Sequence, residues 1–336
     1  MARFLVACGW QTVGVLAIGI VAAFGNSRTF AANAAAAAAV RAIWDSASGQ
    51  IDVVEGDRPV LRYNYQTVQP PDGFLGCVQP ANRKYGRPRS DYIHPLFDLD
   101  GETLTADWSK DHPHHRGIYW AWPEVDYRGQ RGDLHALQNV FARPTGRLNL
   151  RNTADYAEIE AENVWKWEDK TPIVLETATI RVRRSGEHSR FVDLTLKFHA
   201  IADDVALARR GTEHYGGLNL RLAPIRNLNF STHTDAADAT PRASWGEARG
   251  IWGQGDRTAA LAVFQHPGNP QYPAQWIEYP YLPWFQPTFP TTATRYILKK
   301  GQPLELKYRL WIRRGDKLSD ETYRQQWQAY QQASGS

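Results

Sequence analysis

Strict alternation of apolar and polar side chains constrains the fold of this chain more than any other feature. In the segment RFVDLTLKF, residues 190–198, the Val, Leu, Leu and Phe side chains face one way, and Asp, Thr and Lys face the other. A period of two residues is typical of a β-strand with one buried face. The same pattern recurs in residues 304–314, and residues 173–184 and 258–265 are further strand candidates.

Short turn motifs separate these strand candidates. PPDG, DLDG, RRSGEH, HPGNP and KKGQP carry the glycine, proline, asparagine or aspartate that tight turns favour. Strands rich in Val, Thr, Tyr, Phe and Trp, joined by such turns, favour packed antiparallel sheets. We therefore predict a mostly β fold, a large antiparallel β-sandwich. One C-terminal α-helix is expected, because Ser319 can cap the segment ETYRQQWQAYQQ.

The N-terminal region differs from the rest of the chain in composition. Arg3 precedes the apolar run VGVLAIGIVAAF, residues 13–24, which is shorter than a membrane span and is followed by small residues. This arrangement is typical of a signal peptide, which we assign to residues 1–32; an uncleaved N-terminal anchor is the alternative. Residues 33–44 are expected to form an Ala-rich linker, and residues 45–336 a single β-sandwich domain.

Composition narrows the location and the partners. Removal of the signal would leave Cys77 as the single cysteine, which excludes an intrachain disulfide and a multi-cysteine metal site. Export without disulfides suits a protein that is periplasmic or secreted from a bacterium. The formal net charge is only +4, and the sequence has no long basic stripe, so we expect no nucleic-acid partner. No membrane association is expected after signal cleavage.

The segment DHPHHRGIYWAW, residues 111–122, concentrates titratable and aromatic side chains. Pro113 restricts its own backbone and biases His112 towards an extended conformation. In an extended segment His112 and His114 would share one face, and His115 would lie on the other. Because histidine titrates near neutral pH, one of these imidazoles is a candidate general acid or base. The alternative is that the histidines hydrogen-bond to neighbouring backbone and stabilise a turn.

A divalent metal is the other chemistry that this cluster suggests. Two neutral imidazoles, His112 and His114, could bind the ion, with a third ligand from His94, His135 or Glu213. The spacing is not that of a helical zinc motif, so the pattern does not select a metal. We therefore expect no cofactor, with a divalent metal as the alternative.

Several other residues are candidates for substrate contact. Arg116 could hold a carboxylate or an oxyanion, and Glu213 could be the partner carboxylate of a histidine. Tryptophans could stack on the face of a sugar, although most tryptophans in such a chain belong to the core. The expected catalytic residues are His112, His114, His115 and Glu213. The expected substrate-binding residues are Asp111, Arg116, Trp120, Trp122, His94, His266, Asn269 and Trp276, with Trp284 as a further member of the stacking platform.

Three segments resemble one bacterial family. They are YIHPLFDLDGETLTADWSKDHPHHRGIYWAW at residues 92–122, YGGLNLRLAP at 215–224 and AVFQHPGNPQYPAQW at 262–276. The sequence closely resembles the family labelled PmoA or methane oxygenase PmoA, also known as DUF6807. The chain departs from the family pattern after Trp276, where many relatives have His and Arg and this chain has Ile277, Glu278 and Tyr279. A binding role of that pair therefore does not transfer to this chain.

The resemblance implies an exported β-sandwich similar to the galactose-mutarotase-like supersandwich. A methane oxygenase subunit would need membrane spans, which the sequence does not offer after its signal. We expect a secreted carbohydrate-active enzyme, a hydrolase, lyase or epimerase that uses His-centred acid–base chemistry on a sugar or glycoside. The alternatives are a non-catalytic carbohydrate-binding protein and a His-ligated metal-dependent oxidoreductase, the activity that the family label suggests.

Overall fold

The computed structural model describes residues 39–233 and 243–333. The predicted signal peptide, residues 1–32, and the first part of the predicted linker lie outside these ranges. Within them, no helix has the length and apolar character that a membrane span requires.

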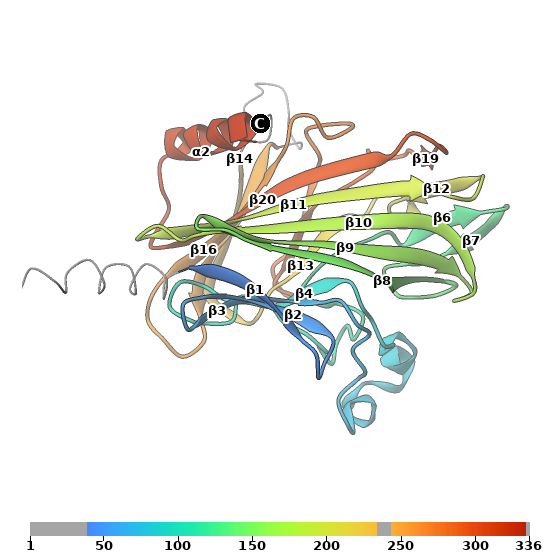
Figure 1. Ribbon diagram of the computed structural model, residues 1–336, viewed down its shortest axis with the longest axis horizontal. Helices are drawn as coiled ribbons and strands as arrows, with labels where there is room; N and C mark the ends of the chain where they lie inside the picture. The colour runs from blue at the N-terminus through green and yellow to red at the C-terminus, as the bar shows by residue number, and fades with distance from the viewer. Residues whose placement is uncertain (1–38, 234–242, 334–336) are drawn as a thin grey trace, which may run out of the picture. The chain divides into compact units, whose positions relative to one another are not determined.

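The described chain consists mostly of antiparallel β-sheet with one C-terminal α-helix, as the alternation predicted (Figure 1). One eight-stranded sheet has the order β1 (Val40–Asp45), β2 (Gln50–Glu55), β3 (Arg58–Asn64), β4 (Tyr92–Leu96), β5 (Ile118–Ala121), β13 (Gly217–Arg221), β18 (Trp284–Pro287), β17 (Trp276–Tyr279). The second eight-stranded sheet has the order β14 (Ile225–His233), β15 (Trp245–Trp252), β16 (Ala259–Gln265), β20 (Leu304–Arg314), β11 (Ser189–Ala200), β10 (Thr171–Arg183), β9 (Tyr156–Trp167), β8 (Val140–Asn152).

A smaller third sheet was not predicted from the sequence. Its four strands have the order β19 (Tyr296–Leu298), β12 (Val205–Ala208), β6 (Glu124–Tyr127), β7 (Gln130–Gly132). Three short 3-10 helices lie in the connections: η1 (Phe74–Cys77), η2 (Pro80–Tyr85) and η3 (Arg210–Thr212). Strands of three or four residues carry too little alternation for a sequence pattern to show them.

The strands expected from alternation are all present. Strand β11 buries Val192, Leu194, Leu196 and Phe198, which are 0% exposed, and β20 covers the expected residues 304–314. One boundary is wrong, because the last residues of the expected linker belong to β1, which pairs with β2. These residues form a β-strand because they pair with β2, which their own composition does not show.

The two large sheets meet through a common core. Trp120 on β5 donates its indole N–H to Glu176 on β10 at 2.6 Å, and Trp165 on β9 donates to the same carboxyl at 2.5 Å. Asp91, just before β4, is hydrogen-bonded to Glu176 and accepts from Tyr63 on β3 at 2.7 Å. Buried polar groups of both sheets are therefore satisfied by each other, as a low-dielectric interior requires.

Helix α2 (Asp320–Ala333) covers part of the second sheet. Ser319 caps it as expected, because its hydroxyl accepts the backbone N–H of Thr322 at 3.2 Å. Tyr323, Trp327 and Tyr330 are spaced along one face and are buried against Trp245, Phe264 and Trp311. The helix is therefore held by an aromatic stripe at helical spacing.

Candidate functional site

The histidine-rich segment lies in the connection between β4 and β5. The backbone N–H of His115 donates to the carbonyl of His112 at 2.9 Å, so the segment is a turn rather than an extended strand. Gly117 follows at φ 57°, and a Cβ at this position would lie 2.2 Å from the carbonyl oxygen of Ile93. Only glycine fits this backbone path, and the path directs the histidines to one end of the sheet.

Asp111 connects this turn to a neighbouring strand of the same sheet. Its carboxylate accepts hydrogen bonds from Arg221 on β13 at 3.0 and 3.1 Å. The same carboxylate lies 3.2 Å from Nδ1 of His112. A carboxylate beside an imidazole fixes the orientation of the ring, so Asp111 and His112 form a polar pair at the surface.

A second turn, residues 133–136, brings another histidine to the same place. Asp133 accepts the backbone N–H of Ala136 at 2.7 Å, which closes the turn after β7. The backbone N–H of His135 donates to the carbonyl of Trp122. Nε2 of His135 lies 2.9 Å from the hydroxyl of Tyr119 on β5, a hydrogen bond that orients the ring.

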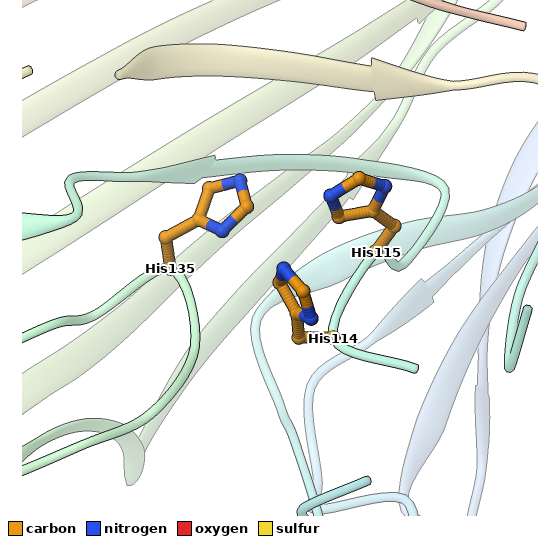
Figure 2. A group of neighbouring side chains, drawn as sticks. All are labelled: His114, His115 and His135. Carbon is orange, nitrogen blue, oxygen red and sulfur yellow. The ribbon is translucent and has the colours of Figure 1, made fainter. Parts of the chain in front are cut away.

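His114, His115 and His135 form a cluster that we call the imidazole trio. Figure 2 shows the three rings turned towards one another from two different turns. The ring centroid of His114 lies 4.6 Å from that of His115 and 5.1 Å from that of His135. One nitrogen from each ring lies within 4.8 Å of the others. The trio therefore joins the two sequence-distant turns at one point.

An open cavity of about 320 Å³ lies over these turns. Polar groups and aromatic rings line it together: Asn82, Tyr85, Asp111, His112, His114, His115, Asp133, His135, Ala136, Arg210, Tyr215, Tyr279, Tyr281, Leu282 and Trp284. Trp284 stacks on His115 at 5.3 Å and on Tyr279 at 5.2 Å. The side chain of Tyr281 is 78% exposed at the rim. The cavity thus combines an aromatic wall with titratable groups.

Burial sets the charge of the trio. It lowers the pKa of His114 to about 3 and lowers the pKa values of His115 and His135 well below the ordinary value, and neighbouring histidines and arginines add to the effect. All three imidazoles are therefore neutral at pH 7, which is the form that binds metal ions. Two of them leave a buried nitrogen unused, because Nδ1 of His114 and Nδ1 of His115 have no hydrogen-bond partner among the described residues.

The two carboxyl groups of the cavity differ in environment. Burial raises the pKa of Asp133 to about 6, although the Ala136 backbone N–H and the charge of Arg210 oppose the shift. Burial acts in the same direction on Asp111, but Arg221 and His112 outweigh it and hold its pKa below the ordinary value. Carboxyl groups held at different pKa values in one cavity are typical of functional sites.

The structure places five of the predicted catalytic, binding and stacking residues at this cavity. Asp111, His112, His114 and His115 line it, as does Trp284. His112 and His114 both line the cavity, but the segment curls into a turn, so His115 lies with them and not on an opposite face. As a result, the cluster with metal-ligand spacing contains His115 and His135 with His114, and does not contain His112.

Three predicted binding residues belong to the core. Trp120 and Trp122 are buried, and their indole N–H groups donate to Glu176 and to the backbone of Phe289. Arg116 is fully buried in an ion pair with Asp107, so it does not reach a ligand. Trp120 lies on β5 and Trp122 follows just beyond its end, two residues further on, so both point into the sandwich.

Glu213 and His94 also lie away from the cavity lining. Glu213 is exposed just after η3, and its neighbour Arg210 lines the cavity instead, because Gly211 reverses the backbone at φ 58°. His94 is hydrogen-bonded through Nδ1 to the hydroxyl of Thr105 at 2.9 Å. Both predicted roles are therefore corrected.

The last predicted binding residues lie in or directly after the connection between β16 and β17. Asn269 donates to and accepts from the backbone of Lys307, at 2.9 and 2.7 Å. His266 contacts Tyr330 of α2, and Trp276 donates its indole N–H to the carbonyl of Ala243 at 2.8 Å. None of the three lines the cavity. The hydrogen bonds of Asn269 and Trp276 hold this part of the chain in place.

Sequence reasoning missed much of the cavity wall. Asp133, Arg210, Tyr215, Tyr279 and Tyr281 were not selected, and His135 was only one of three alternatives for a third ligand. The segment GDLHALQN, residues 132–139, does pair an aspartate with a histidine two positions on, which was the available signal.

The fold and the site define a class of protein: an antiparallel β-sandwich with a histidine-rich cavity at one end of its sheets. The family model of DUF6807, described as a family of unknown function, matches residues 50–328, and the chain belongs to this family. No curated protein matches the sequence.

One solved structure that resembles the chain is the GH36 α-galactosidase AgaB from Geobacillus stearothermophilus. The sequence identity is 9% and the TM-score is 0.38 over 82% of this chain. The chain spans less than half of that enzyme, 41% of its length.

Proposed function

We propose that this protein is an enzyme that acts on a sugar or glycoside in the cavity over the imidazole trio. One observation supports this most: a single open cavity is lined both by aromatic rings and by proton-transfer groups. Aromatic faces stack on the apolar faces of sugars, and imidazole and carboxyl groups exchange protons with hydroxyls. The reaction class is hydrolysis, β-elimination or epimerisation, and export to the periplasm or the medium is part of this proposal.

The roles follow from the geometry of the lining. His112 is the half-exposed imidazole with a carboxylate beside it, and it is the candidate general acid or base with Asp111 as its positioning partner. Asp133 is the second proton-transfer group. Tyr281 and Tyr279 form the stacking wall, and Arg210 is the candidate donor to substrate oxygens.

Incubation with a panel of plant and algal glycosides, followed by NMR of the products, tests the proposal. We expect turnover that falls by a factor on the order of 10²–10⁴ in His112→Ala, the loss typical of a removed acid or base. His188→Ala is the matched control, since His188 is exposed and lies outside the cavity. Its turnover should equal that of the wild type. Sugar binding without turnover would instead indicate a carbohydrate-binding protein and overturn the enzyme proposal.

The stacking wall has its own test. Tyr281→Ala removes an exposed ring from the rim, so substrate KM should rise roughly three- to tenfold, as expected for one aromatic contact. Trp44→Ala is the control, because Trp44 is an exposed aromatic on β1 outside the cavity. Equal KM values in the two variants would exclude stacking on Tyr281.

The imidazole trio favours one second candidate, a metal-dependent oxidoreductase. This is the activity suggested by the methane-oxygenase label that the sequence resemblance brought with it. The NMR experiment, run in air, separates the two candidates, because an oxidoreductase would pass two electrons from the glycoside to O₂ and give a product two electrons more oxidised than the glycoside.

A further inference from the structure

The imidazole trio offers three nitrogen donors and no oxygen donor of its own. His115 is only 4% exposed, and its Nδ1 has no hydrogen-bond partner among the described residues. Nδ1 of His114 is in the same state. A buried polar atom without a partner costs on the order of 1–3 kcal/mol. Packing alone therefore gives no reason for three imidazoles to meet here.

His135 has a hydrogen bond at one ring nitrogen, as histidines that bind a metal through the other nitrogen usually do. Tyr119 occupies Nε2 at 2.9 Å, which leaves Nδ1 of His135 for the space between the three rings. Histidines that bind metals usually hydrogen-bond through their other ring nitrogen, and this partner fixes the tautomer and the ring orientation. Tyr119 is thus placed as an outer partner of a metal ligand.

We propose that His114, His115 and His135 bind one divalent transition-metal ion, with a remaining coordination position open to the cavity. Imidazole ligands suit zinc, copper, nickel, cobalt and ferrous iron, whereas magnesium and calcium require oxygen ligands. Three protein ligands with an open position are the arrangement of a catalytic rather than a structural site. The ion's catalytic role rests on the proposed function: it polarises a substrate oxygen or a bound water in the same cavity.

The geometry requires only a small contraction. Nitrogens bound 2.0–2.1 Å from one ion at tetrahedral angles lie about 3.3 Å apart, and those of the trio lie within 4.8 Å. Ion binding would therefore have to draw the three nitrogens closer together by rotation of the rings about their side-chain bonds. His112 stacks on His115 at 4.7 Å but stays outside the trio.

Metal binding by the wild-type protein tests the proposal before any variant is made. The full-length protein is stripped with chelator and titrated with Zn²⁺ by calorimetry, and with Co²⁺ while its visible absorption is recorded. We expect one ion per chain, and d–d absorption bands of nitrogen-bound Co²⁺. Failure of the wild-type protein to take up either ion at micromolar concentration would overturn the proposal.

Variants then locate the ion. His114→Ala removes the most accessible ligand, and Zn²⁺ affinity should fall by more than the roughly 10–100-fold typical of outer-shell changes. His266→Ala removes a histidine outside the cavity and should leave the affinity unchanged. Circular dichroism confirms folding, and His115→Gln provides a second variant if His114→Ala fails to fold. Equal affinities in wild type and both trio variants would place the ion elsewhere.

The outcomes separate this inference from the proposed function. Metal binding at the trio with no turnover of any glycoside leaves the metal site standing and overturns the enzyme proposal. Full glycoside turnover by the metal-free protein overturns the catalytic role of the ion and leaves the enzyme proposal standing.

Discussion

Tyr119 shows how one residue connects the site to the sandwich. Its hydroxyl meets Nε2 of His135, and the guanidinium of Arg89 lies 4.7 Å from the centre of its ring. Its neighbour Trp120 points the other way and donates to Glu176 of the opposing sheet. Because side chains alternate along a strand, consecutive residues of β5 support the site and the core.

Removal of the Tyr119 hydroxyl should lower the metal affinity of the trio without removing a metal ligand. Tyr119→Phe keeps the ring over Arg89 but frees the nitrogen of His135, so Zn²⁺ affinity should fall roughly tenfold or more. Calorimetry of the chelator-stripped variant measures the change. The control is Tyr63→Phe, a buried hydroxyl that bonds Asp91 and not the trio. Affinity in Tyr119→Phe equal to that of the control would show that the hydroxyl does not orient His135.

At the level of elements, the turn between β4 and β5 connects the site to the sheet. It carries two of the three imidazoles, and Gly117 sets its path at φ 57° against the backbone of β4. The turn is also tied to β13 through Asp111 and Arg221. The position of the histidines therefore depends on three neighbouring strands of one sheet.

Gly117→Ala should destabilise the protein and displace the trio. Its Cβ would lie 2.2 Å from a backbone oxygen, which side-chain rotation cannot relieve, so we expect a loss of about 2–4 kcal/mol in the free energy of unfolding. Gly129→Ala is the matched control, because its φ is also positive at 73° but nothing lies within 4 Å of the added Cβ. It should cost about 1 kcal/mol. Urea unfolding measures both, and equal losses would contradict the argument.

Strands with an alternating sequence pattern could be predicted from the sequence. Segments whose conformation depends on contacts with distant residues could not. Strands β10, β11 and β20 alternate over seven or more residues, so the sequence alone shows their buried face. Strand β16 is buried on both faces, and its continuous apolar run marks it instead. The histidine segment was expected to be extended, because Pro113 restricts its neighbours. The hydrogen bond from His115 to His112 and the contact of Gly117 with β4 instead close it into a turn.

At the scale of the whole molecule, one buried carboxyl pair joins the two large sheets. Glu176 accepts indole N–H groups from both sheets and is hydrogen-bonded to Asp91. Burial, together with the charge of Asp91, raises the pKa of Glu176 well above its ordinary value of 4.5. Burial also raises the pKa of Asp91, against the hydrogen bonds from Glu176 and Tyr63 and the charge of Arg89. The pair therefore keeps a proton at pH values where an ordinary glutamate has already lost its own.

This shared proton makes stability fall as pH rises. Above pH 4.5 the folded state retains a proton on Glu176 that the unfolded chain loses, so the free energy of unfolding decreases by up to about 1.4 kcal/mol per pH unit. The loss continues until pH passes the folded-state pKa. Asp91→Asn can still accept from protonated Glu176 through its amide oxygen but brings no charge, so its stability should depend less on pH. Urea unfolding at a series of pH values above 4.5 compares the two proteins, and parallel curves would refute the shared proton.

Long-range assembly explains what the sequence could not predict. His112, His114 and His115 are adjacent in sequence, so their cluster was visible at once. His135 joins them only because the turn after β7 folds back on Trp122, and Tyr215, Tyr279 and Tyr281 come from segments 100 or more residues after His115. Trp120 and Trp122 were misassigned because composition does not show which face of a strand is buried.

The trio draws its ligands from connections that belong to different sheets. His114 and His115 follow β4 of one large sheet, whereas His135 lies between β7 of the small sheet and β8 of the other large one. An ion held there would link the β4–β5 connection to the β7–β8 connection, since it binds only when both are in place. Occupancy would then raise the melting temperature in proportion to the logarithm of ion concentration, and heat resistance would report how full the site is.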